Sequence, residues 1–286
     1  MNNRPKDMAR RTFWSWLFLL PLVLLTLFPY AVMLTTALKP AAEVYAFPPR
    51  WLGSTLAFEN FAKVWELGLG RSLANSLLIS VVATVLALLL SFPAAYALSR
   101  YRLRRGPRNV YRQFLLLTQM ISPIVLAVGI FKVVADLKLI NWTYPAVYLP
   151  LIVIYAVFNI AFSTWMLQSY FQTIPEELEE AAWIDGCSRA GSFRRIFLPL
   201  VLPAVSITAL FSFIYCWNEF VLAYLILRRP EQSTVTLQVF GLVGGRYTVE
   251  WEQVMAAALI ATLPMVLVFV LAQKQIVSGL SLGSGK

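Results

Sequence analysis

The stretch Glu180-Ala181-Ala182-Trp183-Ile184-Asp185-Gly186 is the most informative part of this sequence. It belongs to a polar, acid-bearing segment, 168–199, that separates two hydrophobic runs, 147–167 and 200–222. Each run is long enough to cross a bilayer, which takes about 20 apolar residues in a helix. We therefore expect the segment to be a loop between two transmembrane helices.

The composition of the whole chain supports a membrane protein. Of its 286 residues, 59% are hydrophobic and 13% are charged, whereas soluble domains average roughly 45–50% apolar and about 25% charged residues. The net charge of +10 comes from basic residues beside the hydrophobic runs, not on one amphipathic face, so we expect no nucleic-acid partner. The sequence has no histidine and no cluster with metal-ligand spacing, so we expect no metal site.

Six runs are predicted to cross the membrane, which makes the fold class an all-α integral membrane protein with six transmembrane helices. Helix is the default because lipid offers no partner for free backbone groups. The prolines inside the runs are expected to kink these helices rather than end them; they are Pro21, Pro93, Pro123, Pro150 and Pro264. The runs are 13–33, 77–97, 114–134, 147–167, 200–222 and 254–272.

The distribution of Lys and Arg predicts the orientation. The link between the second and third runs carries six arginines and no acid, and such basic links stay in the cytoplasm. With six spans, both termini and the 168–199 loop lie on that same side. The first run exceeds the 7–15 residues of a signal peptide and is expected to be retained as a helix. The predicted parts are a cytoplasmic tail 1–12, a first helix 13–33, an extracytoplasmic loop 34–72, a five-helix core 73–272 containing the loop 168–199, and a cytoplasmic tail 273–286.

The loop itself is predicted to form two short helices. Thr173 is expected to cap the first helix, with Pro175 in its first turn, and Gly186 to end it in the left-handed conformation. A second helix should run over about 189–197, before Pro199 and the next span. On this helix–turn–helix element Glu180 and Asp185 are charged acceptors, Ala181 and Ala182 allow close approach, and Phe193 is an apolar anchor. Such an element suits docking into a groove of a partner; an amphipathic hairpin resting on the membrane is the alternative, which its acidic face disfavours.

The same residues resemble a known motif. E-A-A-x-x-D-G followed by Phe193 and by I-x-L-P resembles the EAA loop of permease subunits from binding-protein-dependent ABC importers. The matching residues are Glu180, Ala181, Ala182, Asp185, Gly186, Phe193, Ile196, Leu198 and Pro199. Further segments resemble the sugar-importing branch of this family, and its smaller maltose-type or trehalose-type permeases in particular. They are Lys39-Pro40, Asn75-Ser76, Trp217-Asn218-Glu219-Phe220 and 275–280.

The resemblance implies a fold, a function and a set of partners. It implies a type I ABC importer permease in the bacterial inner membrane, which takes up a di- or oligosaccharide and is not itself an enzyme. A second, different permease would complete the channel, and an extracytoplasmic sugar-binding protein or lipoprotein would deliver the sugar. Two copies of an ATP-binding subunit would hold ATP and Mg and dock on the loop. The implied coupling residues are Glu180, Ala181, Ala182, Asp185, Gly186, Phe193 and Pro199.

Several polar residues within the runs are candidates for the sugar pathway, because hydroxyl groups need hydrogen-bond partners and aromatic rings stack on sugars. They are Gln119, Asn159, Tyr215, Trp217 and Asn218. Hydrogen bonding between helices is the alternative for each. Glu219, near the end of the fifth run, is expected to cap a helix or pack against a subunit at least as readily as it would bind sugar.

Other functions were weighed against this one. A permease for an amino acid, a polyamine, phosphate or glycerol phosphate stays open as the alternative within the importer class. An ion-driven carrier would need an acid buried in mid-span, and a membrane enzyme would need a nucleophile with its base; the sequence offers neither. The terminal Gly283-Ser284-Gly285-Lys286 lacks the spacing of a nucleotide loop, and the tail is expected to insert between the ATPase subunits or to fray. The segment 55–69, with aromatic residues at helical spacing, is expected either to lie on the membrane surface or to form a packed loop.

Overall fold

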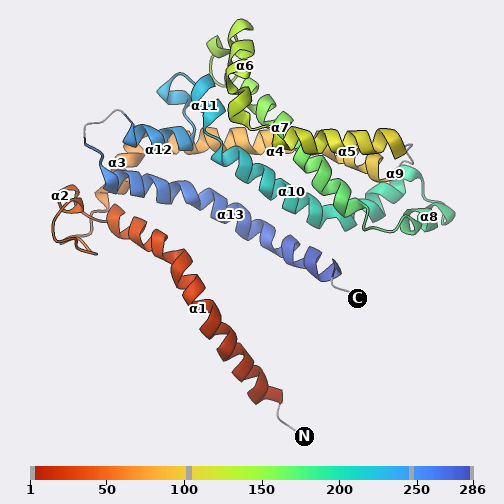
Figure 1. Ribbon diagram of the computed structural model, residues 1–286, viewed down its shortest axis with the longest axis horizontal. Helices are drawn as coiled ribbons and strands as arrows, with labels where there is room; N and C mark the ends of the chain where they lie inside the picture. The colour runs from red at the N-terminus through yellow and green to blue at the C-terminus, as the bar shows by residue number, and fades with distance from the viewer. Residues whose placement is uncertain (1–3, 101–104, 245–247, 284–286) are drawn as a thin grey trace. The chain divides into compact units, whose positions relative to one another are not determined.

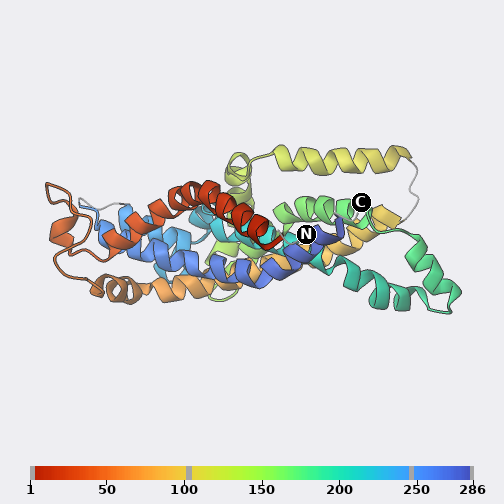
Figure 2. The same cartoon turned by 90° about the horizontal axis from the view of Figure 1, so that it is seen from below.

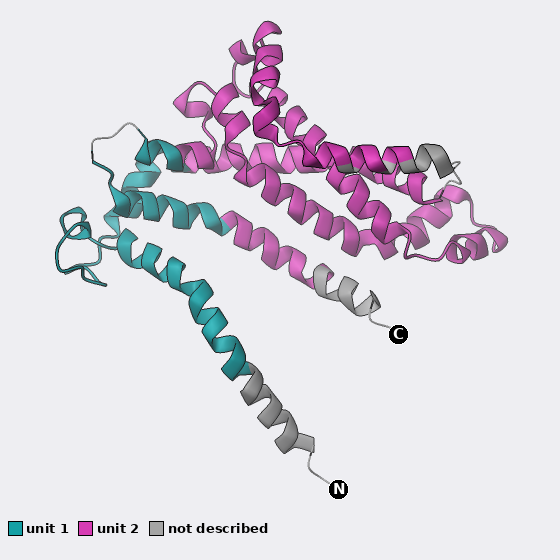
Figure 3. Ribbon diagram, in the orientation of Figure 1, with its two compact units in different colours: residues 1–69, 239–263 teal, residues 70–238, 264–286 magenta. Residues whose placement is uncertain are grey.

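The computed structural model describes residues 4–100, 105–244 and 248–283, with side chains for most of them. Within this part of the chain every regular element is a helix. The chain divides into two compact units, Met1–Leu69 with Val239–Leu263 and Gly70–Gln238 with Pro264–Lys286 (Figure 3). We describe each unit by itself.

The first unit is built on one long apolar helix. Its elements are α1 (Arg4–Ala37), α2 (Ala41–Val44), α3 (Glu59–Val64), the π-helix η1 (Trp65–Leu69), and the parts of α12 (Val235–Val243) and α13 (Trp251–Gly283) that fall within it. The side chains of α1 are exposed from residue 16 to residue 31, as expected for a helix surrounded by lipid or by a partner. The buried amide of Asn60 donates to the carbonyls of Ala37 and Lys39, each at 2.9 Å, and so satisfies the end of α1.

The second unit is a packed helical core. Its elements are α4 (Gly70–Arg100), α5 (Arg105–Met120), α6 (Pro123–Asp136), η2 (Leu139–Asn141), α7 (Tyr148–Phe171), α8 (Glu177–Ile184), α9 (Arg189–Ser192), the π-helix η3 (Phe193–Phe197), α10 (Leu198–Asn218), α11 (Val221–Ile226), η4 (Pro230–Gln232), and parts of α12 and α13. Helix α4 packs against α7 and α10 (Figure 1). Its buried face carries small residues such as Ser80, Ala83 and Ala87, which let helices approach closely in a membrane.

Five helices among the described residues are long and apolar enough to cross a membrane. A sixth span results if the bent pair α5–α6 counts as one. The single spans are Trp16–Ala37, Glu59–Arg100, Ala146–Phe171, Arg189–Asn218 and Trp251–Gln275. Five predicted runs thus coincide with single spans, and the all-α fold class is confirmed.

The third predicted run, 114–134, is wrong as a continuous helix. The chain turns by 88° between Gln113–Met120 and Pro123–Asp136 (Figure 2). Ser122 is extended, with φ −67° and ψ 134°, because the ring of Pro123 disfavours the helical conformation of the residue before it. Pro123 therefore begins α6 instead of kinking a helix. Pro21, Pro93 and Pro264 do lie inside helices, as predicted.

The fifth predicted run, 200–222, also ends earlier than expected. Helix α10 stops at Asn218, and Glu219 is extended with ψ 129°. The carboxylate of Glu219 accepts hydrogen bonds from the backbone N–H groups of Leu222 at 2.9 Å and Ala223 at 3.2 Å. It thus caps α11, one of the two roles expected for it.

Some sequence-based expectations concern residues outside the described part of the chain. They are Arg102 and Arg104 in the arginine-rich link and the final Ser284-Gly285-Lys286 of the tail.

Candidate functional site

The segment 173–197, which we call the elbow, comprises α8, α9 and η3. Its first helix begins at Glu177, and the prediction that Thr173 caps it is wrong. The hydroxyl of Thr173 instead donates to the carbonyl of Tyr170 at 2.8 Å, and its backbone N–H donates to the same carbonyl. Thr173 therefore belongs to the turn that ends α7, and its oxygen faces back toward that helix.

The turn inside the elbow forms as predicted. Gly186 has φ +84°, the left-handed conformation that glycine adopts without steric cost. The N–H of Cys187 donates to the carbonyl of Ala182 at 2.9 Å and that of Gly186 to Trp183 at 3.1 Å, the hydrogen bonds of a Schellman motif. The second helix follows at Arg189, and the hydroxyl of Ser188 caps it by accepting from the N–H of Gly191 at 3.1 Å.

Helix α8 has two chemically different faces. Glu180, Ala181 and Asp185 are exposed, whereas Glu179 and Ala182 are buried against the chain itself. Of the two small residues expected to admit a partner, only Ala181 is therefore on the outer face. Two neighbouring glutamates point in opposite directions, and they have different roles.

The buried face of α8 is fixed to the end of α4 by a network that the sequence did not reveal. Arg100 Nε donates to Glu179 Oε1 at 2.7 Å, and their side chains are only 10% and 5% exposed. The hydroxyl of Tyr96, one turn earlier on α4, donates to Glu179 Oε2 at 2.8 Å. Arg100 Nη1 also donates to the carbonyl of Ile174 at 3.0 Å, just before the elbow helix. We call Tyr96, Arg100 and Glu179 the clamp.

An aromatic cluster supports the clamp. The ring of Phe197 lies 4.9 Å from that of Tyr96 and 5.0 Å from that of Phe171, and the Arg100 guanidinium carbon lies 5.1 Å from its centre. Phe193, predicted as an anchor for a partner, is half-buried and packs edge-on against Phe92 and Tyr96. Its ring therefore contributes mainly to attaching the second elbow helix to α4.

The exposed face of the elbow combines acids with large apolar side chains. Ile184 is 87% exposed at the turn, and Leu178 and Trp183 are also exposed. The guanidinium of Arg189 lies over the Trp183 ring at 5.2 Å, which holds that ring in place. Pro199 is exposed just inside α10. Such a surface, apolar at its tip and acidic beside it, fits a basic and apolar groove on another protein.

The predicted sugar-pathway residues are spread over different environments. Asn159 and Trp217 are buried: the Asn159 amide donates to Tyr155 O at 2.9 Å and to Cys216 Sγ at 3.4 Å, and Trp217 stacks on Phe213. Tyr215 is half-buried, whereas Gln119 and Asn218 are exposed. The Asn218 amide donates to Ile214 O at 2.9 Å. The structure therefore brings Asn159, Tyr215 and Trp217 into one packed region and leaves the other two on the surface.

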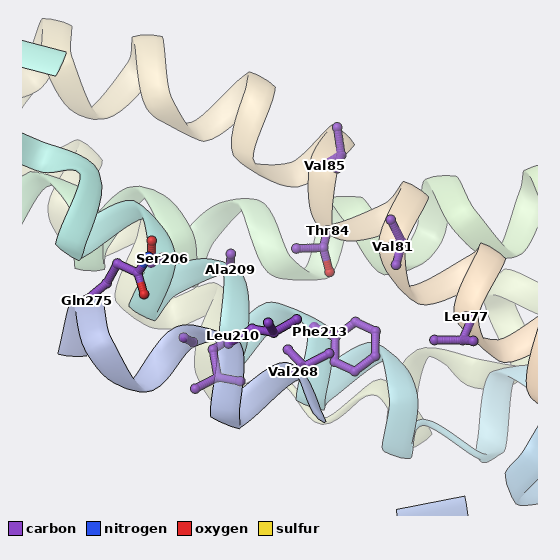
Figure 4. A pocket seen from close by; sticks show the side chains of 12 residues that line it. Leu77, Val81, Thr84, Val85, Ser206, Ala209, Leu210, Phe213, Val268 and Gln275 are labelled. Carbon is purple, nitrogen blue, oxygen red and sulfur yellow. The ribbon is translucent and has the colours of Figure 1, made fainter. Parts of the chain in front are cut away.

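A cavity of about 360 Å³ lies between α4, α10 and the final part of α13 (Figure 4). Its lining is almost entirely apolar, with Thr84, Ser206 and Gln275 as its polar side chains. None of the predicted pathway residues lines it. A sugar needs many hydrogen-bond partners, so this cavity suits hydrocarbon better than sugar. The described residues contain no group of three potential metal ligands.

Comparison with known proteins places this geometry in context. The family described as "Binding-protein-dependent transport system inner membrane component" matches residues 87–281. The diacetylchitobiose uptake system permease DasC of Streptomyces coelicolor is 33% identical, over 91% of each chain. The trehalose/maltose transport system permease MalG of Thermococcus litoralis is 35% identical, over 93% of each. In fold, the chain is similar to a crystal structure of a bacterial ABC transporter for alginate import, with TM-score 0.72 and 22% identity, covering 96% of this chain and 97% of that one.

Proposed function

Because this chain belongs to the family of inner membrane components of binding-protein-dependent transport systems, we propose that it is the permease subunit of an ATP-driven sugar importer. The observation that carries this proposal is the elbow, which presents an acidic and apolar outer face and is fixed to the transmembrane core through its inner face. The elbow is then the part that a separate ATPase moves.

The proposed coupling site is the exposed part of the elbow. Glu180 and Asp185 would meet basic residues of an ATP-binding subunit, and Ala181 would let its surface approach the helix closely. Gly186 sets the turn that presents them. Ala182, Phe193 and Pro199 would act from behind, by keeping the elbow attached to α4 and α10. Two copies of the ATP-binding subunit would hold ATP and Mg, one against this chain and one against a second, different permease.

The proposed substrate is a di- or oligosaccharide delivered by an extracytoplasmic binding protein or lipoprotein. Support comes from two relatives whose names specify diacetylchitobiose and trehalose or maltose. Among the pathway candidates, the exposed Gln119 and Asn218 are free to contact a passing sugar, whereas the Asn159 amide is already engaged by its own chain. We therefore assign Gln119 and Asn218 first to the pathway.

The orientation that follows puts the elbow, both termini and the ATPase in the cytoplasm. The chain's own cysteines provide a test, since Cys187 in the elbow is half-buried and Cys216 is buried. A maleimide that cannot cross membranes should label Cys187 in inside-out vesicles and not in right-side-out vesicles. A Cys187→Ala chain is the control and should not be labelled. Labelling from the outer side would exclude this orientation.

The function is tested by uptake. The chain is expressed with the partner subunits encoded beside it, and labelled disaccharides, amino acids, polyamines and glycerol phosphate are offered to proteoliposomes that contain the complex, its binding protein and internal ATP. We expect ATP-dependent uptake of a disaccharide or oligosaccharide, and loss of that uptake with Glu180→Ala. Uptake of only one of the other solutes would replace the substrate assignment. Uptake by this chain alone under an ion gradient would contradict the proposal as a whole.

A further inference from the structure

Helix α8 of the elbow is attached to two different transmembrane helices. Along the chain it leads through α9 and η3 directly into α10. Through space, its buried Glu179 is held by Arg100 and Tyr96 at the end of α4, 79 and 83 residues earlier in the sequence. A movement of the elbow therefore acts on α4 as well as on α10.

We propose that Arg100 and Tyr96 are positioning residues, which transmit the displacement of the elbow to α4 and so couple ATP hydrolysis to channel opening. This inference rests on the proposed function. It concerns residues that do not touch the ATPase, because all three members of the clamp lie on the inner side of the elbow and its ion pair is almost completely buried.

The chemistry of the clamp suits a positioning role better than a purely stabilising one. Removing two charges from water costs nearly as much as their attraction returns, so a buried ion pair adds little net stability. What it does is to penalise any arrangement in which the two charges separate. The two oxygens of Glu179 each have their own donor, and the Arg100 fork also reaches the carbonyl of Ile174. These bonds define both the distance and the angle between α8 and α4.

The aromatic rings beneath the clamp resist shear in the same place. Tyr96 and Phe92 on α4 contact Phe193, and Tyr96 also contacts Phe197. Because protein interiors are close-packed, rings that interlock in this way move together. The elbow and the last turns of α4 thus form one mechanical body.

The test separates attachment of the ATPase from transmission of its movement. The complete complex is purified through this chain, and two quantities are measured: the amount of ATP-binding subunit that co-purifies, and the sugar transported per ATP hydrolysed. Arg100→Gln and Glu179→Gln should leave co-purification within twofold of the unchanged chain and lower the sugar-to-ATP ratio at least tenfold. Tyr96→Phe, which loses only the hydroxyl, should lower it about threefold.

Two control variants distinguish this role from a general loss of structure. Arg100→Lys retains a positive charge near Glu179 and should keep at least half of the sugar-to-ATP ratio. Glu180→Gln, the exposed neighbour, should instead reduce co-purification of the ATPase.

The inference is overturned if Arg100→Gln and Glu179→Gln keep a ratio within twofold, if they lose ATPase and transport in parallel, or if Arg100→Lys is as defective as Arg100→Gln. Failure of the proposed function is seen separately, in the unchanged chain, as absence of a co-purifying ATPase or of sugar uptake.

Discussion

The two ends of α4 hold their neighbouring segments by different chemistry. At Arg100 the helix binds the elbow through a buried ion pair and a set of aromatic rings. At its other end, the Asn75 amide donates to the carbonyls of Glu231 at 3.1 Å and Ser233 at 3.0 Å, and the Ser76 hydroxyl accepts from the N–H of Val235 at 2.8 Å. The first end recognises side chains, and the second recognises only backbone.

This difference has a consequence for sequence and for energetics. The segment 231–235 could change its side chains and still be held, because its carbonyls and its N–H remain. The elbow could not lose Glu179 without leaving a buried cation unpaired. Breaking a buried pair is costly, about 3–5 kcal/mol, whereas a neutral hydrogen bond contributes about 0.5–1.5 kcal/mol. The elbow end is therefore the more sensitive of the two.

The largest effect is expected in the aromatic cluster. Phe197 is fully buried, and Phe197→Ala should lower the free energy of unfolding in detergent by about 3–5 kcal/mol, since it leaves a cavity beside Phe171 and Tyr96. Thermal unfolding of the purified chain measures this. Phe211→Ala, on the exposed side of the same α10, is the matched control and should cost less than about 1 kcal/mol. Equal costs would show that the cluster is not a core.

The next effect separates two adjacent glutamates. Glu179→Ala should destabilise the chain by about 3 kcal/mol because Arg100 is left buried without its partner. Glu180→Ala should change stability by no more than about 0.5 kcal/mol, because this side chain is exposed. The same unfolding measurement compares them. If both variants unfold alike, the inward and outward faces of α8 have been assigned wrongly.

A smaller effect is expected at the other end of α4. Asn75→Ala removes the donor for two carbonyls and should cost about 1–2 kcal/mol, since each carbonyl regains only part of its bonding from water. Hydrogen exchange of the N–H of Val235 should become faster. Ser76→Ala should have a similar effect, and the double variant should cost less than the sum, because both residues hold one segment. Strict additivity would mean that the two attachments are independent.

The smallest effect is expected at the turn of the elbow. Gly186→Ala should cost about 1 kcal/mol, because its φ of +84° disfavours a side chain although no atom lies within 4 Å of the added Cβ. Gly186→Asn should cost less, because Asn tolerates the left-handed conformation better. Unfolding in detergent again provides the comparison. A larger loss for Asn than for Ala would point to a steric cause instead.

The features that the sequence predicted well are those determined by neighbouring residues. Run length and hydrophobicity located the spans, and Gly186 marked the end of α8, because a left-handed turn depends on local conformation. The second elbow helix over 189–197 was found for the same reason. The resemblance of the 180–186 stretch to the EAA motif was sufficient to predict the family.

The features that the sequence did not reveal depend on packing between distant segments. Nothing in the spacing pairs Glu179 with Arg100, which was counted only as one positive charge in a basic link. Thr173 has the composition of a cap, but the turn that ends α7 already engages its hydroxyl. The break before Pro123 had a visible signal, the proline itself, but the same residue lies inside helices elsewhere in this chain. The coupling and pathway roles stay predictions.

The proline inside α4 gives this helix a built-in joint. Pro93 has no N–H to donate to the carbonyl one turn earlier, so the helix is softest there. It lies two turns before Arg100 and next to Phe92, which places the joint at the border of the aromatic cluster. A pull on the elbow would thus swing the last two turns of α4 as a short arm, while the longer portion toward Asn75 keeps its place in the bundle.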